Sequence, residues 1–183
     1  GQMTGTDSEA TLYFGGIDVP NNRRGYTENW NGSSWTEVAD LNTARSAFGS
    51  AGAGNPASLA FGGYTGTAYS AASESWNGSA WTETNDLNQS RAVNAGIGAT
   101  STSALYAGGY SPSAPNNYVA LTEDWNGASW VEVADLNTAR GNNAASGTAS
   151  AGFVFSGEHP SGGVTTSSEE WSGNTITTKV LTD

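Results

Sequence analysis

Four short apolar runs, each followed by a glycine-containing pair, divide the chain into similar units. The runs read TLYF, SLAF, ALYA and GFVF, and they precede Gly15-Gly16, Gly62-Gly63, Gly108-Gly109 and Ser156-Gly157, respectively. None alternates apolar with polar residues, which is typical of a strand covered on both faces. The runs recur roughly every 47 residues, a period that suits a propeller blade and is too long for tetratricopeptide or ankyrin units.

A tryptophan pair around a polar turn follows each run. Residues 30–45, 76–91 and 125–140 read WNGSSWTEVADLNTAR, WNGSAWTETNDLNQSR and WNGASWVEVADLNTAR. The fourth copy opens at Trp171 and has Ile176 in place of the second tryptophan. Asn-Gly between strand-forming runs favours a hairpin because both residues tolerate positive φ. Each unit therefore predicts four strands: a small-residue stretch (A), the apolar run (B), a strand ending at the first tryptophan (C) and a strand beginning at the second (D).

The order of these motifs resembles the kelch repeat, and the resemblance covers essentially the whole chain. It implies an all-β fold: a β-propeller of four kelch-like four-stranded antiparallel blades, either a closed four-bladed ring or part of a larger ring. The single domain would span 1–183, with blades at approximately 1–41, 42–87, 88–136 and 137–183. The WNG-x-x-W and DLNTAR segments are also similar to kelch-like repeat arrays of bacteriophage tail and fibre proteins, which implies a virion or extracellular location.

The ends of the array bear on its assembly. Kelch propellers usually contain more than four blades, and no strand from one terminus completes the blade at the other terminus here. Exposed blade faces and strand edges invite association with another chain. We therefore expect either a homo-oligomer, such as two copies forming a larger ring, or a longer chain in which residue 1 is a cut or processed end.

Composition and charge argue against several classes of partner and cofactor. Hydrophobic residues make up only 36% of the chain, so the Trp, Tyr and Phe residues must supply much of the core. A net charge of −11 argues against nucleic acid and anionic membranes as partners, and no apolar stretch is long enough to insert into a membrane. The chain has no cysteine and one histidine, too few ligands for a transition-metal site or for the copper chemistry of some kelch-fold oxidases. We expect no metal and no cofactor.

Charged and aromatic residues recur at fixed repeat positions. The carboxylates and arginines could ring an axial site, or each Glu–Arg pair could tie a blade together; we favour the second interpretation because repeated positions usually serve the scaffold. The tryptophans could stack on sugar rings, but core packing is the favoured role. These structural candidates are Glu28, Glu74, Glu123, Glu169, Arg45, Arg91, Arg140, Trp30, Trp35, Trp76, Trp81, Trp125, Trp130 and Trp171.

Specificity is expected in the segments between strands B and C. These segments, 17–25, 64–72, 110–121 and 158–167, differ in length and sequence while the flanking strands barely change. An up-and-down meander brings the B–C loops to one face, where adaptable contact residues suit recognition, although such loops can also be merely tolerated surface. The binding candidates are Arg23, Arg24, Tyr64, Tyr69, Tyr110, Asn116, Asn117, Tyr118 and His159.

Three functional hypotheses follow from the sequence. The preferred one is a non-enzymatic module that binds a glycan or a protein receptor through its B–C face. The second is a purely structural repeat segment of a virion or extracellular assembly. The third is a polysaccharide hydrolase or lyase with an acidic axial site. No catalytic residue can be assigned, because Glu169 and Glu170 are adjacent and would point to opposite faces of a strand, and no G-x-S-x-G elbow is present.

Overall fold

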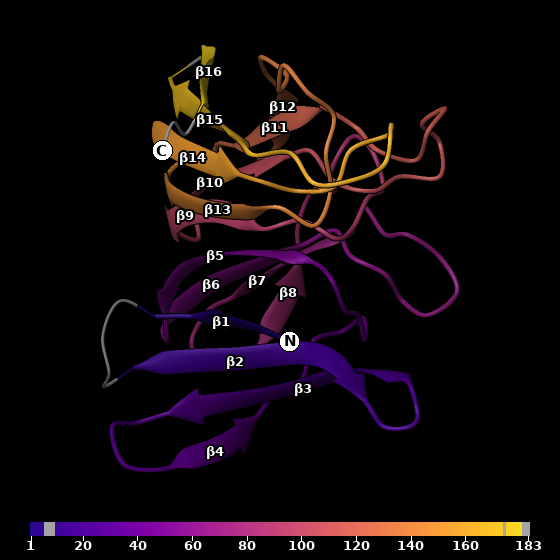
Figure 1. The fold of residues 1–183 in the computed structure, drawn as a ribbon. Helices are drawn as coiled ribbons and strands as arrows, with labels where there is room; N and C mark the ends of the chain where they lie inside the picture. The colour runs from indigo at the N-terminus through magenta and orange to yellow at the C-terminus, as the bar shows by residue number, and fades with distance from the viewer. Residues whose placement is uncertain (6–9, 174, 181–183) are drawn as a thin grey trace.

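The computed structural model describes residues 1–5, 10–173 and 175–180, and this part of the chain is all-β. Its strands form four four-stranded antiparallel sheets, each built from consecutive strands in up-and-down order (Figure 1). This confirms the all-β class and the four-stranded units. The strands are β1 Gln2–Thr4, β2 Thr11–Asp18, β3 Asn22–Trp30 and β4 Trp35–Val38 in blade 1; β5 Gly49–Gly54, β6 Ala57–Phe61, β7 Ser73–Trp76 and β8 Trp81–Glu83 in blade 2; β9 Gly96–Thr100, β10 Ser103–Ala107, β11 Thr122–Trp125 and β12 Trp130–Glu132 in blade 3; and β13 Ala144–Thr148, β14 Ala151–Phe155, β15 Ser167–Ser172 and β16 Ile176–Val180 in blade 4. The described residues contain no helix long and apolar enough to cross a membrane.

The turn between the third and fourth strands of blades 1 to 3 depends on an asparagine side chain. Asn31 Oδ1 accepts hydrogen bonds from the backbone N–H groups of Ser33 and Ser34, both at 3.0 Å. Of the Asn-Gly pair, only Gly32 takes a positive φ, at 92°. The hairpin therefore forms as expected but by a different mechanism, because the loop is longer than a two-residue turn and the asparagine acts as an acceptor. The same pair of bonds recurs at Asn77 and Asn126.

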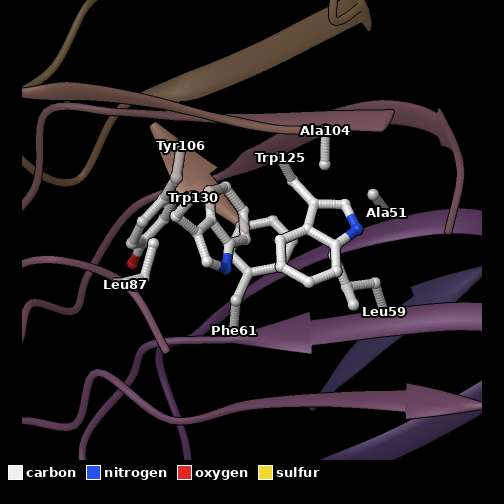
Figure 2. Packing of buried hydrophobic residues seen from close by; sticks show 8 residues of the cluster. All are labelled: Ala51, Leu59, Phe61, Leu87, Ala104, Tyr106, Trp125 and Trp130. Carbon is white, nitrogen blue, oxygen red and sulfur yellow. The ribbon is translucent and has the colours of Figure 1, made fainter. Parts of the chain in front are cut away.

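Consecutive blades pack face to face, with β1 against β5, β5 against β9 and β9 against β13. Figure 2 shows the cluster between blades 2 and 3, where Trp125 and Trp130 pack with Leu59 and Phe61. The ring centroids of Phe61 and Trp130 are 4.8 Å apart. Trp130 Nε1 also donates a hydrogen bond to Ser73 Oγ at 3.0 Å, so the polar atom of the indole is satisfied inside the junction.

The other two junctions use the same repeat positions. Between blades 1 and 2, Trp81 packs on Phe14 with 4.8 Å between ring centroids and donates its indole N–H to Thr27 Oγ1 at 3.0 Å. Between blades 3 and 4, Trp171 is buried, whereas Ile176 stands in place of the second tryptophan and is only partly buried. Burying one such tryptophan removes on the order of 150–250 Å² from water, which stabilises the fold by about 4–6 kcal/mol.

The glycine pair at the end of each apolar strand receives the linker that leads to the next blade. Gly109 N–H donates to the carbonyl of Arg140 at 2.8 Å, and Gly108 takes a φ of 79°. A Cβ atom on Gly108 would lie 2.6 Å from that carbonyl oxygen, so a larger residue would displace the linker. The same backbone bond joins Gly16 to Arg45 and Gly63 to Arg91. The glycine pairs therefore hold successive blades at a fixed spacing.

The two ends of the array carry exposed aromatic residues. Trp35 stands where Trp81 and Trp130 stand in the next two blades, yet it is 45% exposed against 5% for those two. At the other end, Phe153 is 39% exposed. In the described residues β13 is not among the strands packed closely against β1, and Figure 1 shows β4 and β16 at opposite ends of the array. The core role expected for Trp35 is therefore corrected, because no other described blade covers that face of blade 1, and Trp30 on the same face is only half-buried.

Gly108→Ala is expected to destabilise the protein by about 2–4 kcal/mol, since an alanine there meets both an unfavourable φ and the Arg140 carbonyl. Gly162→Ala is the matched control. Its φ is 80°, but nothing lies within 4 Å of the added carbon, so only about 1 kcal/mol of backbone strain is expected. Urea unfolding followed by tryptophan fluorescence measures both losses. Equal losses would show that the glycine pair does not hold the linker.

Candidate functional site

The chain folds back after each glycine pair, and in blades 2 and 3 this pairs two tyrosines at the surface. Tyr64 forms an isolated β-bridge with Tyr69, and Tyr110 forms one with Tyr118. The inter-blade linker holds the other side of Tyr64, whose backbone N–H donates to Ser46 O at 2.8 Å while Ser46 N–H donates back at 3.0 Å. These tyrosines therefore have fixed backbones although they belong to loops of variable sequence.

Four rings form a continuous series of pairwise contacts, two tilted and one edge-to-face, which we call the tyrosine ladder: Tyr64, Tyr69, Tyr110 and Tyr118. Ring centroids are 5.1 Å apart for the first step, 5.5 Å for the second and 5.4 Å for the third. The middle step crosses from blade 2 to blade 3. All four residues are partly buried, so each ring packs on its neighbour and keeps some surface in solvent. Such aromatic contacts are worth about 0.5–1.5 kcal/mol each beyond area burial.

Blades 1 and 4 supply the two ends of the ladder. The guanidinium carbon of Arg23 lies 4.8 Å from the Tyr64 ring centroid, which is a cation–π contact. At the far end, Tyr118 Oη donates to Glu158 Oε2 at 2.9 Å. One surface thus draws on all four blades and has a cation at one end and an anion at the other. Sequence reasoning missed Glu158, although it directly follows its glycine-containing pair as Tyr64 does.

The remaining binding candidates make no cation–π contact or side-chain hydrogen bond with a ladder ring among the described residues. Arg24 Nε donates to Asp18 Oδ2 at 2.6 Å, and this guanidinium lowers the pKa of the Asp18 carboxyl. His159 Nδ1 lies 2.6 Å from Ser161 Oγ. The last two candidates are the exposed Asn116 and Asn117.

The environment of the ladder raises the pKa of two of its hydroxyl groups. Burial, followed by the neighbouring Tyr110 and Tyr64 hydroxyls, raises the pKa of Tyr69. The hydrogen bond to Glu158 raises the pKa of Tyr118, since it favours the neutral phenol as donor. At these two positions the environment therefore favours the uncharged phenol beside the aromatic face.

The repeated arginines lie inside the blade junctions. Arg140 Nη2 donates to Glu169 Oε1 at 2.7 Å, and Arg140 Nη1 donates to the carbonyls of Ser156 and Ser167 at 3.0 and 2.9 Å. Burial lowers the pKa of Arg140, and the charge of Glu169 opposes that shift. The corresponding pairs are Arg45 with Glu74 and Arg91 with Glu123. All six residues are at most 1% exposed, so a ligand reaches them only if the blades separate.

Each buried glutamate recognises a whole linker segment, not the arginine alone. Glu74 Oε2 accepts hydrogen bonds from the backbone N–H and side-chain amide of Asn42, at 2.7 and 3.0 Å. Asn88 and Asn137 make the same two bonds to Glu123 and Glu169. Glu28 differs, because it is exposed and has no ion pair among the described residues. The scaffold role expected for Glu28 is thus corrected, because no other described blade packs against that face of blade 1.

The axis of the array holds a small cavity of about 280 Å³. Residues of β1, β5, β9 and β13 line it, and the described lining residues include no carboxylate. The described residues also contain no group of three His, Asp or Glu side chains placed to hold a metal ion.

The fold defines a propeller-like repeat protein, and the ladder gives it one continuous aromatic surface. A comparison with protein-family models finds no match, and no curated protein shows significant similarity to the chain. Its function must therefore be argued from its own residues.

Glu74→Gln is expected to destabilise the protein by about 3–5 kcal/mol, because it leaves the Arg45 guanidinium as an uncompensated buried charge. Glu28→Gln makes the same chemical change at the same repeat position of blade 1, where the side chain is exposed. It should change the free energy of unfolding by less than about 0.5 kcal/mol. Urea unfolding measures both, and similar costs would contradict the role of the buried pair.

The ladder is expected to lose stability at alkaline pH, since folding raises the pKa of Tyr69 and of Tyr118. An acid whose pKa is higher in the folded state stabilises that state below its unfolded pKa of about 10, and this contribution is lost as the pH rises through the folded value. The free energy of unfolding should therefore fall above about pH 10, and less steeply in Tyr118→Phe. Urea unfolding from about pH 9 to 11 tests this; identical profiles for both proteins would refute it.

Proposed function

We propose that this protein is a non-catalytic kelch-like propeller module that binds a glycan on the tyrosine ladder, as part of a bacteriophage tail or fibre or of an extracellular adhesin. The observation that carries the proposal is the continuous series of tyrosine ring contacts, which begins at Arg23 of blade 1 and ends at Glu158 of blade 4. The kelch-like assignment is supported by blades 1 to 3, in which a glycine pair, a tryptophan hairpin and an Asp-Leu-Asn-x-x-Arg linker follow in the same order.

The chemistry of the ladder suits sugar rings. Tyrosine offers a rigid apolar face that costs little conformational entropy on binding, and its hydroxyl group adds a hydrogen bond at the edge of the ring. The raised pKa values of Tyr69 and Tyr118 favour the uncharged phenol, and the anion that the ladder contacts is the carboxylate of Glu158. Glu158 and Arg23 supply charged hydrogen-bonding groups at the ends, where the polar substituents of a glycan can be oriented.

The variable length of the loops also favours recognition. The loops that carry the ladder differ between blades, while strands, glycine pairs and tryptophan hairpins repeat almost unchanged. Recognition residues typically lie on variable loops held by a rigid scaffold. A purely structural role is the second candidate, and the specific observation that favours it is the pair of exposed blade faces at the ends of the array.

Tyr69→Ala and Tyr110→Ala are each expected to weaken glycan binding at least ~10-fold, because each removes a central ring of the ladder. A glycan array with the 183-residue chain identifies the ligand, and calorimetry with that glycan measures the loss. Tyr26→Ala is the control, since Tyr26 is 50% exposed and lies outside the ladder; its binding should stay unchanged.

Three outcomes would overturn the proposal. Equal binding by all variants would place the site elsewhere. If the chain binds a protein receptor and no glycan, and this binding depends on Tyr69 and Tyr110 in the same way, the ladder is assigned to protein recognition. No ladder-dependent binding in either assay would favour the purely structural role.

A further inference from the structure

Each filled junction contains a socket for an arginine side chain. In blade 4 the socket has three polar walls: the carbonyl of Ser156, the carbonyl of Ser167 and the carboxylate of Glu169, all bonded to Arg140. In blade 2 the same walls are the carbonyls of Gly62 and Ala72 and the carboxylate of Glu74, all bonded to Arg45. The incoming arginine always belongs to the linker that precedes the blade.

In blade 1, residues at the same three repeat positions line a cavity of about 260 Å³. Gly15 lines it at the position of Gly62, Tyr26 at the position of Ala72 and Glu28 at the position of Glu74. These equivalences follow from the strand register, because Tyr13 pairs with Glu28 as Ala60 pairs with Glu74. Blade 1 thus has residues at all three socket positions, and none of the described linker arginines lines the cavity.

Blade 3 shows how the tyrosine in this cavity would receive a guanidinium. Tyr106 occupies the register position of Tyr13, since it pairs with Glu123. The guanidinium carbon of Arg91 lies 4.8 Å from the Tyr106 ring centroid. Tyr13 lines the blade 1 cavity in the same place, so it offers an equivalent cation–π surface.

The charge around the cavity is complementary to an arginine. Glu28, Glu37 and Asp18 line it together with a single cation, Arg24, and Arg24 is already paired with Asp18. The exposed Trp35 lies on the same sheet face as Glu28, because both stand in register with that face of β3. In blades 2 and 3 the corresponding tryptophans are buried by the preceding blade.

We propose that this face of blade 1 is a docking site for a further blade of the same repeat type, whose Leu-Asn-x-x-Arg linker inserts its arginine between Tyr13 and Glu28. The linkers of the described blades cannot fill the socket, since Arg45, Arg91 and Arg140 are each fully buried in their own junctions. An external linker that presents a guanidinium therefore fits the site best. The inference rests on the blade junctions and is independent of the tyrosine ladder.

A chain with one added blade tests the proposal. Gln2 pairs with Phe14 as Gly49 pairs with Phe61, so residues 49–94 joined directly to Gln2 place a second copy of Arg91 as far ahead of β1 as Arg45 stands ahead of β5. In this five-blade chain, Glu28→Gln should lower the melting temperature by roughly 10 °C, because it breaks a newly buried ion pair. In the original chain the same substitution should leave it unchanged.

Glu83→Gln is the matched control, since Glu83 is an exposed carboxylate of blade 2, and it should be silent in both chains. Acrylamide quenching should also show Trp35 protected only in the five-blade chain. An equal effect of Glu28→Gln in both chains, or a Trp35 that stays exposed, would overturn the proposal.

If the five-blade chain does not fold, a peptide of sequence VADLNTARSAFG decides the matter. It should bind the original chain saturably and quench Trp35, and both effects should weaken at least ~10-fold when its arginine is replaced by leucine or when the protein carries Glu28→Gln. No saturable binding up to about 1 mM, or binding that ignores both changes, would overturn the docking site. A concentration-dependent dimer that buries Trp35 but is indifferent to Glu28→Gln would assign the face to a second copy of the chain instead.

Discussion

One arginine at each junction bonds to two blades at once, and the rest of the array depends on this arrangement. The carbonyl of Arg140 accepts a hydrogen bond from Gly109 of blade 3, while its guanidinium pairs with Glu169 of blade 4. The linker is therefore fixed at both sides by a single residue. Glycine is required where the arginine carbonyl approaches the preceding blade, and glutamate is required where the guanidinium binds the following blade. The glycine pair, the arginine and the glutamate therefore act together in each junction, although they lie far apart in sequence.

The same arrangement positions the tyrosine ladder. Ser46 directly follows Arg45, and its backbone exchanges two hydrogen bonds with Tyr64. Ala92 follows Arg91 and does the same with Tyr110. Tyr64 and Tyr110 are thus held by the residue that directly follows the junction arginine, and that arginine sets the spacing of the blades. The spacing of the blade junctions consequently brings the tyrosine rings of neighbouring blades into contact. The variable loops determine only which side chains stand at these positions.

The repeat made most of the fold predictable from the sequence, because the same strand, turn, glycine-pair and tryptophan-pair patterns recur from copy to copy. Two things could not be derived from it. The exposure of Glu28 and Trp35 depends on whether a blade precedes them in space, which no residue within blade 1 encodes. The partnership of Tyr118 with Glu158 joins loops of different length, whose approach depends on how far each loop folds back. The sequence period predicts the repeated strands and turns, whereas the candidate site is formed by loop residues that differ between the copies.

The exposed faces of blade 1 and blade 4 correspond to the two opposite sides of a blade junction. Blade 1 presents the face that receives a linker, with Glu28 and Trp35, which in later blades packs on the blade before it. Blade 4 presents the opposite face, where Phe153 and Phe155 stack with 5.8 Å between ring centroids at the positions held by Leu59 and Phe61 in blade 2. An interface between unlike faces is heterologous, so blades added through these faces would extend the array in one direction until they closed a ring.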